Sequence, residues 1–340
     1  MKLNNLIKNQ QFMFMVMVLL FGFFSLWVVG NLSTPILTSI VLALLFRPMQ
    51  VYFTKIGIPE RLSVFITFFT AVLLATLFFL IFIPLFINEA NRYLTELPSL
   101  AVIVEPLTDL LGEVNAPNES IEGAQSFLTE ISGFASDAVS FGISRLQDTA
   151  NLFLSIILVP IFLFFWLWDT NTLSSGFSKL VPKKRKFLAR VWTETNTNFQ
   201  NYFKAKFIEV FIVAVTGSFM FWALGLNSPV LLGVSFGLSQ LIPFFGPVFM
   251  TFPVLIVSLA QFGLDPYVIV ILLFYALLQN IDGNIFLPFL MSGVVKLPAV
   301  VVLLSVFLFG AIFGIWGVFF AVPIASFIKS LMDNWKYVDS

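Results

Sequence analysis

The chain has 340 residues, of which 59% are hydrophobic and only 11% are charged, and its mean hydropathy is +0.98. Soluble globular proteins carry about 25% charged residues, so this composition excludes that class and indicates a polytopic membrane protein. Histidine and cysteine are both absent from the sequence, which excludes disulfides, thiolate nucleophiles and His- or Cys-ligated metal sites. We therefore expect no catalytic residue, no metal site and no cofactor, and we expect that the protein is not an enzyme.

The apolar segments predict an all-α membrane protein with about eight membrane segments. A transmembrane helix needs about 20 predominantly apolar residues. In chain order the segments are 12–29, 32–46, 62–87, 151–168, 207–226, 229–262, 267–281 and 299–328. Two of them, 229–262 and 299–328, are long and interrupted, which predicts broken or re-entrant helices in the C-terminal half.

Charged residues predict how the chain is divided and oriented. We expect N-terminal membrane helices in three segments (1–87), an acidic helical extracytoplasmic insertion (88–150), a fourth membrane helix (151–168), a basic cytoplasmic interfacial loop (169–206), a C-terminal membrane core (207–331) and a cytoplasmic tail (332–340). An excess of lysine and arginine marks the cytoplasmic side of a membrane protein. The basic loop therefore predicts a bacterial inner-membrane protein with both termini in the cytoplasm.

The run 229–262 holds 34 residues without a charge. As one straight helix it is roughly 51 Å long, whereas the hydrocarbon core of a bilayer is about 30 Å thick. Pro243 and Pro247 each remove a backbone donor, and Gly246 supplies conformational freedom, so we expect two half-length helices joined by a non-helical turn. Such breaks often hold the binding site of secondary transporters. The alternative is a surface loop that joins two ordinary helices.

The last apolar run contains three glycines, Gly310, Gly314 and Gly317, followed by Pro323. Gly310 and Gly314 have the spacing of a motif that lets membrane helices pack closely. The run therefore predicts either a close-packed helix or a second broken helix that hinges.

Asp282 is the first candidate for binding a solute or an ion. Ionisable groups inside membrane segments are costly, so they are functional candidates. Asn280 and Asn284 flank Asp282, and this polar group suits a cation, a proton or a hydroxyl-rich solute. The alternative is a helix end at the cytoplasmic surface, where Asn and Gly are common.

Two further candidates for the binding site are Gln240 and Glu209. Gln240 precedes the predicted break at Pro243 and is placed to line the same cavity. Glu209 lies three residues after Lys206, so the alternative for Glu209 is an ion pair at the membrane interface.

Three motifs in this order resemble the autoinducer-2 exporter-like (AI-2E) transporter family, also called PerM-type permeases. They are Leu241-Ile-Pro-Phe-Phe-Gly-Pro247, Asp282-Gly-Asn-Ile-Phe-Leu-Pro288 and Gly310-x-x-x-Gly314-x-x-Gly317. The resemblance covers essentially the whole chain, and its specific motifs lie in residues 204–328. It implies a multi-pass inner-membrane transporter that forms a homo-oligomer, with a pentamer as one candidate size. Some relatives are linked to export of the signal autoinducer-2, and others to exchange of sodium or lithium for protons.

The first functional hypothesis is a secondary transporter that exports a small solute, such as autoinducer-2, by alternating access. A nucleotide-binding loop is absent from the sequence, so a gradient or a partner has to drive transport. The first alternative is a Na⁺(Li⁺)/H⁺ antiporter. The second alternative, from a different functional class, is a membrane scaffold whose residues 88–150 bind a partner. The expected partners are membrane lipids and either a small solute or a monovalent cation and a proton. Nucleic acid is not expected.

Overall fold

The computed structural model describes residues 33–96, 149–169, 186–263, 265–291 and 297–334, with a few isolated positions outside these ranges. Within these ranges the chain is helical and contains no strand. The elements are α3 (Ser33–Lys55), α4 (Glu60–Glu96), α7 (Thr149–Trp168), α9 (Lys186–Ala223), α10 (Pro229–Ser239), α11 (Phe245–Phe262), α12 (Tyr267–Ile281), the π-helical turn η2 (Asp282–Phe286), α13 (Leu287–Leu290) and α14 (Ala299–Asp333).

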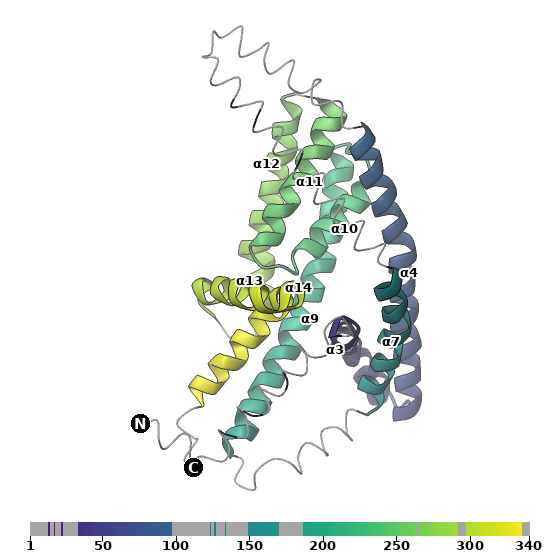
Figure 1. Ribbon diagram of the computed structural model, residues 1–340, viewed down its shortest axis with the longest axis vertical. Helices are drawn as coiled ribbons and strands as arrows, with labels where there is room; N and C mark the ends of the chain where they lie inside the picture. Colours follow the sequence, from purple (N-terminus) through teal and green to yellow (C-terminus); the bar gives the residue numbers. More distant parts are fainter. Residues whose placement is uncertain are drawn as a thin grey trace. The chain divides into compact units, whose positions relative to one another are not determined.

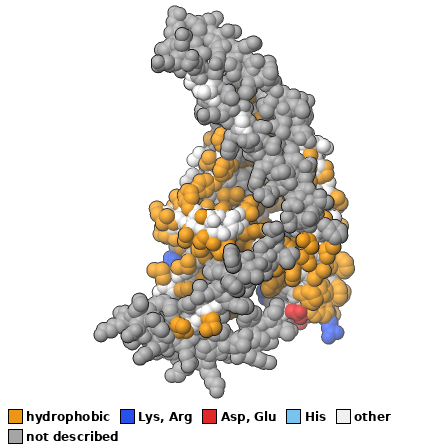
Figure 2. Space-filling model, viewed as in Figure 1, with side chains coloured by type: hydrophobic (Ala, Val, Ile, Leu, Met, Phe, Trp, Pro, Cys, Tyr) orange, Lys and Arg blue, Asp and Glu red, His pale blue; other side chains and the backbone are white. Residues whose placement is uncertain are grey.

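Six helical segments among the described residues are long and apolar enough to cross a membrane. They are Ser33–Lys55, Glu60–Glu89, Phe187–Ala223, Phe245–Phe262, Tyr267–Leu290 and Ala299–Asp333, and two shorter apolar helices are Leu154–Trp168 and Pro229–Ser239. Hydrophobic side chains cover most of the described surface in Figure 2. The described part of the chain is thus all-helical and has the composition of a multi-pass membrane protein. The segment 12–29 lies almost wholly outside the described residues, so the count of eight and the re-entrant geometry stay predictions.

The chain divides into two compact units, which we describe separately. Unit 1 comprises Met1–Thr76, Ala150–Phe207 and Met291–Ser340. Its helices α3, α4 and α7 pack around a small apolar core that consists of Ala43, Val64, Ala71, Leu163 and Leu167. Many large apolar side chains on α4 and α7 are exposed, as expected for helices that face lipid.

Unit 2 comprises Leu77–Thr149 and Ile208–Leu290. Helix α11 contacts both α10 and α12, and α11 and α12 run side by side in Figure 1. The core of this unit is larger and draws on α9, α10, α11 and α12; its members are Val213, Phe221, Leu226, Leu232, Phe236, Met250, Val254, Val257, Ile271, Tyr275 and Leu278. This packing fixes the turn between α10 and α11 against α12.

Two helix boundaries differ from the sequence-based expectation. Helix α9 runs from Lys186 to Ala223 without an end at residue 206, so most of the expected basic loop belongs to the same helix as the next membrane segment. No proline or glycine interrupts the sequence between Pro182 and Gly217, and nothing therefore stops the helix there. Helix α3 likewise continues to Lys55, through Pro48.

The acidic insertion falls largely outside the described residues. Helix α4 extends into it as far as Glu96, beyond the expected end of the third membrane segment at residue 87. The extracytoplasmic position of residues 88–150 and the scaffold hypothesis that depends on it stay predictions.

Figure 1 shows that helix α14 is bent. The backbone leaves helical conformation at Gly314, which has φ 59° and ψ −141°. This region of backbone conformation is accessible essentially only to glycine. The two halves pack closely beside the bend: a Cβ atom at Gly317 would lie 1.8 Å from the carbonyl oxygen of Phe309, and one at Gly310 would lie 2.8 Å from Val318 Cγ2. The last apolar run is therefore both broken and closely packed, whereas its hinge role stays a prediction.

Replacing Gly314 with alanine is expected to lower the free energy of unfolding by about 1–3 kcal/mol, the usual cost of a side chain in this backbone region. Apart from the neighbouring backbone of its own helix, no atom of the described residues lies within 4 Å of a Cβ built at Gly314, so the effect comes from backbone conformation and not from a clash with packed neighbours. Thermal unfolding in detergent micelles measures it. An unchanged unfolding temperature would show that the helix tolerates the bend without glycine.

Candidate binding site

Helices α10 and α11 meet at a tight non-helical turn in unit 2. The turn is closed by backbone hydrogen bonds, in which Phe245 N donates to Pro243 O (2.8 Å) and Gly246 N donates to Ile242 O (3.0 Å). Phe244 adopts a positive φ of 65° within the turn. The break that Pro243, Gly246 and Pro247 predict is therefore present in the chain, and whether it lies at membrane depth stays a prediction.

Glycine at position 246 is required by close contact between the two helices. A Cβ atom at Gly246 would lie 1.6 Å from the backbone oxygen of Ser239, at the end of α10. On the other side of the turn, the carbonyl of Pro247 accepts hydrogen bonds from the hydroxyl of Tyr275 on α12 and from Thr251 Oγ1 (3.1 Å). Helix α12 thus holds the start of α11 in place.

The side chain of Gln240 reaches from the break to α12. It is 4% exposed, and its Nε2 donates to Gln279 Oε1 over 3.1 Å. A buried amide has to be hydrogen-bonded because an unpaired one is costly. The pair therefore joins the end of α10 to the helix that carries Asp282.

Asp282 lies one helical turn after Gln279, and the residue is 2% exposed. The alternative interpretation of Asp282 was that the helix ends there. The structure has no helix end at this point, because α12 continues into the π-helical turn Asp282–Phe286 and then into α13. The Gly and Asn residues after Asp282 are accommodated inside this turn, which is why they do not end the helix. Single π-turns inside α-helices are frequent at functional sites.

Asn280 and Asn284 do not join Asp282. Successive helical residues are about 100° apart, so a residue two positions away points to nearly the opposite side. Both asparagines are exposed in the single chain, and each amide nitrogen donates to the carbonyl four residues earlier, Asn280 to Ala276 (2.8 Å) and Asn284 to Asn280 (2.9 Å). The structure thus buries the predicted Asp282 but leaves these two asparagines exposed on another side of the helix, and their role in binding stays a prediction.

Glu209 is the second buried carboxylate of unit 2, with 1% exposure. It lies on α9 next to Val210, whose carbonyl oxygen would be 2.4 Å from a Cβ atom at Gly237 on α10. Gly237 comes one turn before Gln240, so this close crossing brings Glu209 to the same end of α10. The crossing depends on glycine, because a larger side chain at Gly237 would meet the backbone of α9.

Two residues of the site, Gln279 and Tyr275, are not among the site residues predicted from the sequence. Gln279 lies three positions before Asp282, and this helical spacing was the available signal that they share a face. Tyr275 lies four positions before Gln279 and packs on Phe236 of α10, with 4.9 Å between ring centroids. Within the described ranges, no three His, Cys, Asp or Glu side chains gather in a way that could hold a metal ion.

Replacing Gln279 with leucine is expected to lower the free energy of unfolding by about 1–3 kcal/mol, because the buried amide of Gln240 loses its acceptor. The double variant Gln240→Leu/Gln279→Leu is expected to recover most of this loss, since both polar groups are then removed. Thermal unfolding in micelles compares the three proteins. Equal stability of Gln279→Leu and the wild type would mean that the pair is not maintained.

Comparison with known proteins extends over the whole chain. The sequence profile described as AI-2E family transporter matches residues 14–337. The provisionally named permease PerM of Escherichia coli is 28% identical over 330 residues, which cover 94% of this chain and 92% of PerM. The provisionally named transport protein YrrI of Bacillus subtilis is 24% identical over 316 residues, or 91% of this chain and 88% of YrrI. A provisionally named transport protein of Thermotoga maritima is 22% identical over 338 residues, or 97% of each chain.

Proposed function

The chain belongs to the AI-2E family of transporters, and from that premise we propose that it exports a small polar solute across the bacterial inner membrane. The proposed mechanism is secondary transport by alternating access, and autoinducer-2 is the first substrate to test. The proposal includes assembly into a homo-oligomer, with both termini in the cytoplasm.

The observation that carries this proposal is the burial of Asp282 in a helical segment that is otherwise apolar enough to cross a membrane. A carboxylate in such a segment is costly and is retained where it serves a solute, an ion or a proton. The Gln240–Gln279 amide pair lies one turn away and offers both donors and acceptors. Together these groups suit an uncharged solute that carries several hydroxyl or carbonyl groups.

The break between α10 and α11 allows α10 to move relative to α12, and this movement changes the hydrogen bonding of the site. Gln240 is the residue that follows α10, so a movement of that helix against α12 breaks or forms its hydrogen bond to Gln279. Irregular backbone is tolerated at membrane depth where it is buried in protein or lines a cavity. We propose that solute replaces the amide–amide hydrogen bond during transport.

Export from living cells tests the proposal. Cells that overproduce the protein are loaded with labelled autoinducer-2, and the rate at which label reaches the medium is compared with that of cells with an empty vector. Faster release with the wild type and vector-like release with Asp282→Asn support the proposal. Equal release from all three, with both proteins present in the membrane, would exclude this substrate. Sodium- or lithium-dependent proton movement in everted vesicles would then favour the antiporter.

A further inference from the structure

Helices α9 and α14 pack against each other in unit 1, and the contacts between them define an antiparallel register. Asn334 Nδ2 donates a hydrogen bond to Glu194 Oε2. Further along, the ring of Phe203 contacts the rings of Phe319 and Phe320, at centroid distances of 5.6 and 5.7 Å. Residue numbers therefore increase along α9 in the direction in which they decrease along α14.

Between these two contacts lies a buried layer of polar side chains, which we call the polar layer. It consists of Thr195 and Asn198 on α9 and Ser326 and Ser330 on α14, each between 0% and 8% exposed. Four buried atoms of this layer have no hydrogen-bond partner among the described residues: Thr195 Oγ1, Asn198 Nδ2, Ser326 Oγ and Ser330 Oγ. Native structures leave few such groups, so each requires an explanation.

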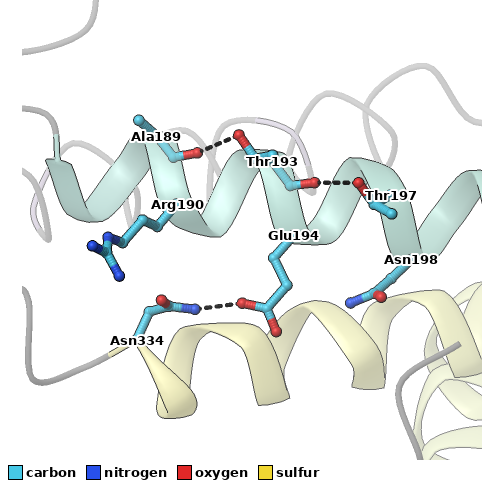
Figure 3. Close-up of a pocket in the computed structure, with 7 residues that line it drawn as sticks. All are labelled: Ala189, Arg190, Thr193, Glu194, Thr197, Asn198 and Asn334. Atoms are coloured by element: carbon cyan, nitrogen blue, oxygen red, sulfur yellow. Dashed lines mark hydrogen bonds between the residues drawn. The ribbon is translucent and has the colours of Figure 1, made fainter. Parts of the chain in front are cut away.

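An open pocket of about 510 Å³ leads to this layer from the end of the two helices. It is lined by Ala189, Arg190, Thr193, Glu194, Thr197, Asn198 and Asn334. Figure 3 shows Glu194 and Asn198 extending from α9 toward α14, and Asn334 reaching toward Glu194. Asn198 belongs to both the pocket and the polar layer, so the pocket borders the layer.

We propose that the polar layer is a gate, at which α9 and α14 separate during transport and admit water and solute from the cytoplasmic side. Its role in transport rests on the proposed function. In the closed arrangement four polar atoms lack partners, and in the open arrangement water satisfies them. This difference lowers the cost of opening, whereas opening an apolar helix interface would expose apolar surface to water.

The bend in α14 supplies the hinge for such a gate. Gly314 separates residues 315–333, which carry Ser326 and Ser330, from the first half of the helix. The aromatic contact of Phe203 with Phe319 and Phe320 lies between the bend and the polar layer. A tilt of residues 315–333 about Gly314 that separates the polar layer therefore also separates this aromatic contact.

The absence of cysteine from the sequence makes the gate directly testable. Ser330→Cys places a thiol of nearly the same size in the polar layer, and Ala71→Cys is the matched control in the apolar core of unit 1. Both positions are 0% exposed. Labelling with N-ethylmaleimide in native membranes is expected to be at least about tenfold faster at position 330, because labelling of a buried thiol requires local opening. Equal, slow labelling would overturn the gate and would indicate a permanently closed layer filled by ordered water.

Cross-linking tests whether opening is needed for transport. The double variant Glu194→Cys/Asn334→Cys is treated with a short bifunctional methanethiosulfonate, and solute flux is measured before treatment, after it and after reduction. We expect flux to be lost on cross-linking and restored by reduction, while the two single variants are unaffected by the reagent. Undiminished flux in the cross-linked protein would overturn the gate and leave the proposed function intact. If the chain moves no solute at all, the proposed function fails, and the labelling rate still decides whether the layer opens.

Discussion

Replacing Asp282 with asparagine is expected to reduce solute transport by about 10- to 100-fold, while the protein remains folded in the membrane. Asparagine has nearly the same shape, so it occupies the buried position in the π-helical turn without a clash. It removes the negative charge, and a hydrogen bond to a charged group contributes about 1.5–3 kcal/mol, which corresponds to this range of rates. Initial rates of solute uptake into everted vesicles, normalised to the amount of protein, measure the effect.

Asp265→Asn is the matched control for this experiment. Asp265 belongs to the same unit, but it lies in the exposed turn before α12, where its Oδ1 accepts a hydrogen bond from Tyr267 N over 2.7 Å. The amide oxygen of asparagine can accept the same hydrogen bond, so transport is expected to stay at the wild-type rate. Full activity of Asp282→Asn would remove Asp282 from the transport site.

Replacing Gly246 with alanine is expected to disrupt the junction of α10 and α11. The added Cβ atom would lie 1.6 Å from the backbone oxygen of Ser239, which cannot rotate away as a side chain can. The two helices have to move apart, and overpacking of this kind costs about 1–3 kcal/mol or more. We expect a lower unfolding temperature in micelles and reduced transport, because the position of Gln240 depends on the same turn.

Gly283→Ala is the matched control for stability. Gly283 also lies in unit 2, in the turn η2, and a Cβ atom there would have no atom within 4 Å. Its unfolding temperature is expected to equal or slightly exceed that of the wild type, since alanine favours helix over glycine by up to about 1 kcal/mol. If Gly246→Ala unfolds at the same temperature as Gly283→Ala, the close contact between α10 and α11 is not a constraint.

The parts of the site that sequence could predict are those with a strong local signal. Pro243, Gly246 and Pro247 disrupt an apolar run that is too long for one span, and a turn is present there. Gly314 lies where the last run bends, as one of the two hypotheses for that run predicted. Asp282 was predicted because a carboxylate beside an apolar segment is rare. Each of these features acts within a few residues along the chain.

The parts that sequence could not predict depend on contacts between distant residues. The partner of Gln240 is Gln279, 39 positions away, and no local pattern indicates that these two amides meet. The π-helical turn changes which side chains around Asp282 face inward. The polar layer between α9 and α14 combines residues more than 120 positions apart, and its serines look unremarkable when the sequence is considered alone.

Solute flux by the purified protein in proteoliposomes tests the central claim most directly. Wild type, Asp282→Asn and Asp265→Asn are reconstituted in equal amounts, and entry of labelled autoinducer-2 is followed with and without an imposed proton gradient. We expect gradient-dependent entry with the wild type and Asp265→Asn, and little entry with Asp282→Asn. Equal entry with all three proteins would contradict the assignment of a transport site to Asp282 and the Gln240–Gln279 pair.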